Sequence, residues 1–367
     1  MIDFIEVRDL SFDVVGIIDA AKSIIWHSVY YGVGDFEIYI PADPKNIAML
    51  RVGHYLTRHN NDDVGIIESI TFDFSEKSGF MMTASGQFAK SILDRRIIYN
   101  ISGNTNRPTI LRGKVEVAVR QVILNNAINC TFDNRRNISV LGLGALNNIP
   151  DIIVDENGNA AQKQVSYENL LTYTDAVLQE YNLSSKIILQ DSLLKYVVWQ
   201  GVDRSDTIVF STDYDNLNSV NYNYNQSTLR NSALVGGEGE GLDRFYSMVT
   251  ENLEGLELRE LFVDASSVNR KYKEEGSEEE QQYTDEEYAA MLNQQGKRIL
   301  KQNIITESLD GNLNISYGQW RYGTDFSLGD IVTVQFDLIQ KYIKTRIIEA
   351  TEVQDDNGYN VDIVYGT

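Results

Sequence analysis

The first 85 residues alternate apolar and polar positions with the period of β-strands. Short runs of β-branched and aromatic residues are separated by turn-forming stretches such as "YGVGD", "PADPKN", "RHNNDD" and "SEKSG". These runs predict strands over 2–7, 11–18, 24–30, 35–40, 55–57, 64–73 and 80–84. Short strands at even spacing are typical of a small barrel or sandwich, so we expect an N-terminal β-barrel domain over 1–88.

The hydrophobic period then changes to that of helices. Segments 86–98 and 112–129 place apolar residues about one turn apart, which predicts two amphipathic helices. A third helix follows a loose connection, with Ser166 as its expected N-cap and Asn182 as its expected end. We therefore expect a helical or mixed middle region over 89–195.

The second half of the chain returns to the strand pattern. Segment 196–271 predicts a β-rich middle region, although strands from 195–260 could instead complete the N-terminal barrel. An acidic helix is expected over 272–303, because Ser277 and Thr284 are capping signals and cations gather only near its end. The remaining strands predict a C-terminal β-barrel domain over 304–367.

The two ends of the chain share a sequence pattern. Leu50–Gly86 and Phe326–Gly366 each contain an apolar residue before glycine, a hairpin, an "IIE" strand, a polar turn and a closing strand. The aligned positions are Gly53 with Gly329 and 66–68 with 347–349. The pattern predicts an α+β, mainly β protein with two small antiparallel β-barrel domains related by an internal repeat.

Charge and cysteine content narrow the classes of function. The chain has 53 acidic and 32 basic residues, for a net charge of -21, and such a field repels nucleic acid and anionic membranes. Its single cysteine, Cys130, excludes an internal disulfide and is expected to be buried. The sequence contains no run of about 18 consecutive apolar residues, so it predicts no membrane-spanning helix.

The clearest candidate for chemistry is a glycine-rich loop formed by Gly236, Gly237, Gly239 and Gly241. It contains two glutamates where a phosphate would bind, and the residues after it alternate like a strand rather than a helix. The loop is therefore expected to connect two strands. The three histidines lack the spacing of a metal or catalytic motif, so no catalytic, cofactor-binding or metal-binding residue is predicted.

Four stretches occur in an order that resembles one family. They are "SGQFAKSILDRRII", "VEVAVRQVILNNAIN", "NSALVGGEGEGLDR" and "YGTDFSLGDIVTV". In order and spacing they resemble the tail-tip hub, or tail-associated, proteins of siphoviruses, which are similar to the baseplate hubs of contractile phages. The resemblance makes the four glycines a marker of the family.

The resemblance implies a structural protein of the virion tail tip, made in the host bacterial cytoplasm. It implies a homotrimer whose six barrels form a pseudo-sixfold ring that closes the tail tube and opens for DNA exit. The implied partners are the distal tail protein ring, the tail tube and tape measure protein, receptor-binding or fibre proteins and, transiently, the exiting DNA. Two alternatives stay open: a hydrolase of cell walls or glycans, and a host-surface glycan-binding module that uses some of the 21 tyrosines.

Overall fold

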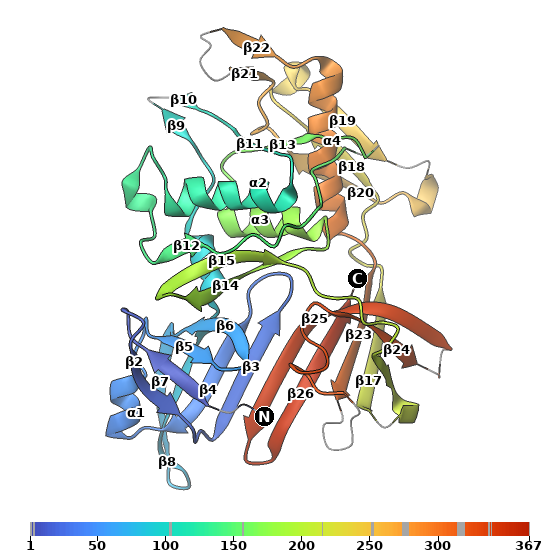
Figure 1. The fold of residues 1–367 in the computed structure, drawn as a ribbon. Helices are drawn as coiled ribbons and strands as arrows, with labels where there is room; N and C mark the ends of the chain where they lie inside the picture. Colours follow the sequence, from blue (N-terminus) through green and yellow to red (C-terminus); the bar gives the residue numbers. More distant parts are fainter. Residues whose placement is uncertain are drawn as a thin grey trace.

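The protein is an α+β structure that consists mainly of β-strands (Figure 1). The computed structural model describes residues 2, 4–102, 105–155, 158–214, 216–250, 253–273, 279–313, 320–336, 338 and 340–366. Within these ranges the buried apolar side chains form four clusters. The clusters interleave in the sequence, since Phe12, Tyr55, Val64 and Ile66 enter the core of the middle region, but each is a separate small core.

A ten-stranded sheet forms the lower part of the molecule in Figure 1. Its hydrogen-bonded order is β17-β23-β26-β25-β3-β4-β8-β7, while β24 pairs with β25 and β16 pairs with β24. The strands from the N-terminal part of the chain are β3 (Ser23–Val29), β4 (Asp35–Pro41), β7 (Ser69–Ser75) and β8 (Gly79–Gln87). The others are β16 (Val209–Ser211), β17 (Leu217–Asn225), β23 (Thr306–Leu313), β24 (Ile331–Phe336), β25 (Lys341–Asp355) and β26 (Gly358–Gly366).

A second, four-stranded sheet packs against the N-terminal half of the large one. Its order is β2-β1-β5-β6, and its strands are β1 (Ile5–Arg8), β2 (Val14–Ile18), β5 (Tyr55–Arg58) and β6 (Asn61–Ile66). Strand alternation buries Trp26, Phe36 and Leu56 between the two sheets. The turn expected at "PADPKN" is wrong: it begins helix α1 (Pro44–Met49), because the Asp43 side chain accepts from the Asn46 amide at 2.8 Å.

Two α-helices, short 3-10 and π-helical turns and several short strands form the middle of the molecule. They are η1 (Ala89–Arg95), β9 (Ile101–Ser102), β10 (Thr105–Asn106), β11 (Thr109–Arg112), α2 (Val115–Ile123), η2 (Leu124–Ile128), η3 (Asn134–Arg136), β12 (Leu141–Leu143), β13 (Gln162–Val165), α3 (Leu170–Gln179), β14 (Ser184–Gln190) and β15 (Leu193–Trp199). The first expected helix is a 3-10 turn, η1, and the second continues into a π-helical turn, η2.

Helix α3 begins later than the sequence predicts. Its N-cap is Asn169, whose side chain accepts from the Thr172 amide at 3.1 Å. Ser166 is buried instead, and its hydroxyl accepts a hydrogen bond from Asn106. The helix ends at Gln179, three residues before the expected stop at Asn182, which adopts a φ of 56° in the turn that follows. Cys130 is buried, as predicted.

A small outer unit consists of one long helix and a three-stranded sheet. Helix α4 (Asp285–Gln302) covers one face of the sheet β19-β18-β20, formed by β18 (Ser232–Gly236), β19 (Tyr246–Thr250) and β20 (Glu260–Asp264). The remaining elements are η4 (Thr212–Tyr214), η5 (Gly241–Asp243), η6 (Gly255–Glu257), β21 (Lys271–Lys273) and β22 (Glu280–Gln282).

The acidic helix expected over 272–303 is shorter than predicted. Thr284 and Glu287 form the predicted capping box, so the helix starts at Asp285. Of the acidic residues before it, Glu280 lies in strand β22 (Glu280–Gln282), which pairs with β21. The other expected cap, Ser277, lies outside the described residues.

Strands from 195–260 do not complete the N-terminal sheet as the sequence allowed. β16 pairs with β24 in parallel, and β17 pairs with β23 antiparallel, so both join C-terminal strands. Their apolar residues Phe210 and Leu217 enter the C-terminal core with Val332 and Tyr365. None of the sheets closes into a barrel within the described part of this single chain.

Candidate functional site at the junction of the two sheet halves

The large sheet is made of two halves that meet where β25 pairs with β3. The pairing is antiparallel and runs from Glu349 opposite Val29 to Asp355 opposite Ser23. On one side of this junction the order is β3-β4-β8-β7, and on the other it is β17-β23-β26-β25. The junction therefore joins the edge of one half to the edge of the other, although the two halves lie at opposite ends of the chain.

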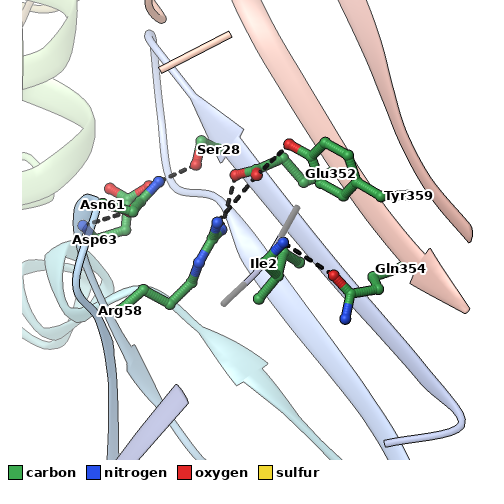
Figure 2. A network of polar contacts seen from close by, with 8 residues as sticks. All are labelled: Ile2, Ser28, Arg58, Asn61, Asp63, Glu352, Gln354 and Tyr359. Carbon is green, nitrogen blue, oxygen red and sulfur yellow. Dashed lines mark hydrogen bonds and ion pairs between the residues drawn. The ribbon is translucent and has the colours of Figure 1, made fainter. Parts of the chain in front are cut away.

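A buried ion pair beside the junction joins β5 of the four-stranded sheet to β25. Arg58 donates two hydrogen bonds to Glu352, from Nη1 to Oε1 at 2.7 Å and from Nη2 to Oε2 at 3.0 Å (Figure 2). The side chains are only 7% and 6% exposed, and Tyr359 also donates to Glu352 Oε2, at 2.7 Å. Arg58 packs over the Trp26 ring as well, with 5.2 Å from its Cζ to the ring centroid. A bidentate arginine in such an environment fixes the four-stranded sheet, which packs on the N-terminal half, to the C-terminal half.

Two further hydrogen bonds extend this network. Ser28 donates from Oγ to Asp63 Oδ2 at 2.5 Å, and Ile2 donates from its amide to Gln354 Oε1 at 2.9 Å (Figure 2). Burial raises the pKa of Asp63 above its ordinary value, and the bond from Ser28 opposes that shift. Burial also raises the pKa of Tyr359, and the negative charge of Glu352 adds to the shift.

A cavity of about 590 Å³ opens beside the network. Its lining includes Arg58, Asp63, Glu352, Trp320 and Tyr359. Three carboxylates line it, and each has a partner: Glu352 accepts from Arg58 and Tyr359, Asp63 accepts from Ser28, and Asp62 pairs with Lys186. Among the described residues, no group of three or more His, Cys, Asp or Glu side chains is arranged to hold a metal ion. The arrangement holds two sheet halves together.

The two repeated glycines have the same backbone geometry. Gly53 has a φ of 91° and donates its amide to the Ile67 carbonyl at 2.7 Å, while the Ile67 amide donates to the carbonyl of His54 at 2.9 Å. Gly329 has a φ of 82° and makes the matching bonds. Its amide donates to the Ile347 carbonyl at 2.8 Å, and the Ile347 amide donates to the Asp330 carbonyl at 2.9 Å. The structural partner of Ile347 is thus Ile67, one position after the one that the sequence alignment gives.

The glycine-rich loop connects strands β18 and β19, as predicted. A Cβ on Gly236 would lie 2.7 Å from Arg244 Nε, and one on Gly237 would lie 2.6 Å from the Tyr288 hydroxyl on α4. Gly239 and Gly241 instead adopt φ angles of 104° and 55°. Two of the glycines therefore allow close packing, and the other two allow the chain to turn.

The family model described as Siphovirus ReqiPepy6 Gp37-like protein matches residues 4–367. The chain belongs to this family. This confirms the resemblance to siphovirus tail proteins that the four sequence motifs indicate. Among curated proteins, none matches the chain.

Solved structures of phage tail proteins have the same fold over nearly the whole chain. The 43 kDa tail protein of prophage MuSo2 from Shewanella oneidensis has a TM-score of 0.58 at 12% identity, and 99% of this chain and 98% of that chain are covered. The tail protein from Neisseria meningitidis MC58 has a TM-score of 0.56 at 13% identity, with coverages of 99% and 96%. Prophage tail protein gp18 from Listeria monocytogenes EGD-e has a TM-score of 0.50 at 9% identity, with coverages of 99% and 94%.

These comparisons place the family among structural proteins of phage tails. Among the helices described, none is both long and apolar enough to span a membrane. The sequence did not identify Arg58, Glu352 and Tyr359, because the arginine and the glutamate are 294 positions apart in the chain. The residues next to them in the sequence do not indicate that the three side chains lie close together in the fold.

Proposed function

We propose that this protein is the hub of a siphovirus tail tip, where three copies close into a ring of six equivalent sheet halves. The observation that carries the proposal is the pairing of β25 with β3. It joins the last strand of one half to the first strand of the other, in the order β17-β23-β26-β25-β3-β4-β8-β7. Such head-to-tail contacts generate closed rings when each step adds the same rotation.

The two halves correspond strand by strand. Each half contains a hairpin at one end (β8 with β7, β26 with β25) and a further antiparallel pair at the other (β4 with β3, β23 with β17). The matching hydrogen bonds of Gly53 and Gly329 support the same correspondence. By this correspondence β7 is equivalent to the second part of β25, and β17 is equivalent to β3.

The outer edges of the sheet, β7 and β17, are therefore the strands with which a second chain would pair. β7 and β17 each pair on one side only within the described residues. β7 also exposes Phe72 and Phe74, at 58% and 61%, and an apolar unpaired edge promotes pairing with another chain. Pairing of β7 with the β17 of a neighbouring copy would repeat the internal junction between chains.

A ring of three chains would present six equivalent sheet halves to a hexameric neighbour. On this proposal the barrel domains expected over 1–88 and 304–367 are completed between chains. The ring would dock on the distal tail protein ring, continue the tail tube around the tape measure protein, carry receptor-binding or fibre proteins and open for DNA exit. The net charge of -21 would keep exiting DNA from adhering to the channel wall.

Cysteine cross-linking between edge strands tests this function. Cys130 is buried, so Thr71→Cys on β7 and Asn223→Cys on β17 would introduce the only exposed thiols in the described residues. With a flexible bis-maleimide, the double variant is expected to give cross-linked products that stop at three chains. The single variants are the controls, and they are expected to give no trimer. A product ladder beyond three chains, or no link in assembled particles, would contradict the closed ring.

A further inference from the structure

The outer face of the sheet β19-β18-β20 is apolar and has no covering element among the described residues. Leu234 on the central strand lies opposite Met248 on one side and Phe262 on the other. These side chains are 37%, 49% and 53% exposed. The inner face of the same sheet packs on α4 so closely that a Cβ on Gly296 would lie 2.7 Å from Val235.

An arginine completes this outer face. The Arg244 guanidinium lies between the rings of Tyr246 and Phe262, with Cζ 5.9 and 5.4 Å from their centroids. It donates to the carbonyls of Gly236 at 3.0 Å and Gly237 at 3.1 Å, and it pairs with Asp264. The side chain is therefore held rigidly in place. Aromatic residues, methionine and arginine are the residue types enriched in protein interfaces.

Two matching turns lie at opposite ends of β19. Glu240–Asp243 and Glu254–Glu257 read "EGLD" and "EGLE", and each forms a 3-10 turn. The glycines adopt φ angles of 55° and 59°, and the leucines that follow them, Leu242 and Leu256, are completely exposed, at 105% and 100%. Each turn exposes an entire leucine side chain to solvent. A partner that covered both side chains would bury this apolar surface.

The charge around this face selects the kind of partner. Segment 231–264 contains eight acidic residues and only two basic ones, Arg244 and Arg259. Arg244 pairs with Asp264, one of these eight acids, and Arg259 donates to the Gln226 carbonyl at 2.5 Å, so eight negative and two positive charges leave this segment with six net negative charges. A second copy of this chain would bring the same acidic rim against it, and like charges oppose that contact.

We infer that this face binds a different protein, one that presents an apolar ridge flanked by lysine or arginine side chains. The apolar row Met248–Leu234–Phe262 and the two exposed leucines would contact the ridge. The acidic residues of the rim, including Glu257 and Glu260, would contact its cations. The face belongs to a sheet separate from β7 and β17, so the inference does not depend on the proposed ring.

Photocross-linking in cells that assemble the particle tests this contact. The photoreactive residue p-benzoylphenylalanine replaces Phe262, and the adduct is identified by mass spectrometry. We expect an adduct with one other protein, through a peptide in which basic residues flank apolar ones. An adduct only between copies of this chain, an adduct with an acidic peptide, or no adduct would overturn the inference.

Two substitutions on the same photoreactive chain sharpen the test. Leu242→Ser and Leu256→Ser leave the core untouched because both side chains are fully exposed, and together they are expected to lower the adduct yield by at least about tenfold. The matched control is Leu10→Ser, an exposed leucine between β1 and β2, which is expected to leave the yield unchanged. An equal yield in all three proteins would overturn the role of the two turns.

Discussion

Arg58 on β5 and Glu352 on β25 form a bidentate ion pair beside the junction of the two sheet halves, with distances of 2.7 and 3.0 Å. Both side chains are nearly inaccessible to solvent. The pair thus connects a hairpin near the start of the chain to its last one. Its loss would leave one charge buried without a partner, which is the costly outcome for such pairs.

Arg58→Met is expected to lower the free energy of unfolding by about 3–5 kcal/mol, because it leaves the buried Glu352 carboxylate without its cation. Chemical denaturation measures the change. The matched control is Lys344→Met, which breaks the exposed pair with Asp206 and should cost far less, because solvent screens that pair. Equal losses in the two variants would show that the junction does not depend on the buried pair.

The backbone geometry of the repeated glycines leads to a second prediction. Gly53→Ala is expected to cost about 1–2 kcal/mol from its positive φ alone, because the nearest atom to the new Cβ is 3.5 Å away. Gly329→Ala should cost more, since its Cβ would also lie 2.4 Å from the Tyr30 ring. Gly142→Ala, where φ is not positive and the nearest neighbour is the flexible end of Lys195, is the control in thermal unfolding. A Gly53 variant as stable as the control would contradict the strain argument.

The glycine-rich loop offers a comparison within a single turn. Gly237→Ala is expected to loosen the outer sheet from α4, because the new Cβ would lie 2.6 Å from the Tyr288 hydroxyl and 2.8 Å from Leu292. Gly241→Asn should be tolerated, since asparagine accepts a positive φ and no atom lies within 4 Å of the new Cβ. Hydrogen exchange of β18 amides measures the difference, and faster exchange in both variants or in neither would refute it.

The pKa of Asp63 predicts how stability depends on pH. Burial raises this pKa above 3.8, so the folded state binds the proton more tightly than the unfolded state does. Ionisation of Asp63 therefore lowers stability as the pH rises from 3.8 through the raised pKa. Asp63→Asn is expected to be more stable than the original protein at pH 7, because the neutral amide avoids the cost of burying the carboxylate charge.

The gain from Asp63→Asn should disappear as the pH is lowered to 3.8 and below, where Asp63 is neutral in both states. Asp62→Asn is the matched control, because Asp62 is exposed and its ion pair with Lys186 lies at the surface. Urea unfolding at several pH values checks both variants. A loss of stability at pH 7 in Asp63→Asn would contradict the sign of the shift.

The sequence predicted most strands because their alternation is a local property of the chain. It treated 64–73 as one strand, whereas β6 and β7 are separated where the Ile67 amide turns to the His54 carbonyl. It also missed α1, which is a single short helix that depends on the Asp43 cap. Local patterns do not contain the register between distant strands, and this is why β16 and β17 were not assigned to the C-terminal sheet.

The candidate site was harder to predict than the fold. The pattern around Gly53 and Gly329 pointed to related geometry, and the matching hydrogen bonds bear this out at the two glycines. The pairing of β25 with β3 joins segments more than 300 positions apart, and single-sequence periodicity gives no information on such contacts. The motif resemblance supplied the phage tail family, which the family model then confirmed.

Electron cryomicroscopy of the intact particle tests the central claim most directly, because it counts the copies of this 41.6 kDa chain at the tail tip and resolves the contacts between them. The account predicts three copies in a closed ring, with β7 of each paired to β17 of the next and the six sheet halves facing a sixfold neighbour. Another number of copies, or a ring in which β7 of one copy does not pair with β17 of the next, would contradict it.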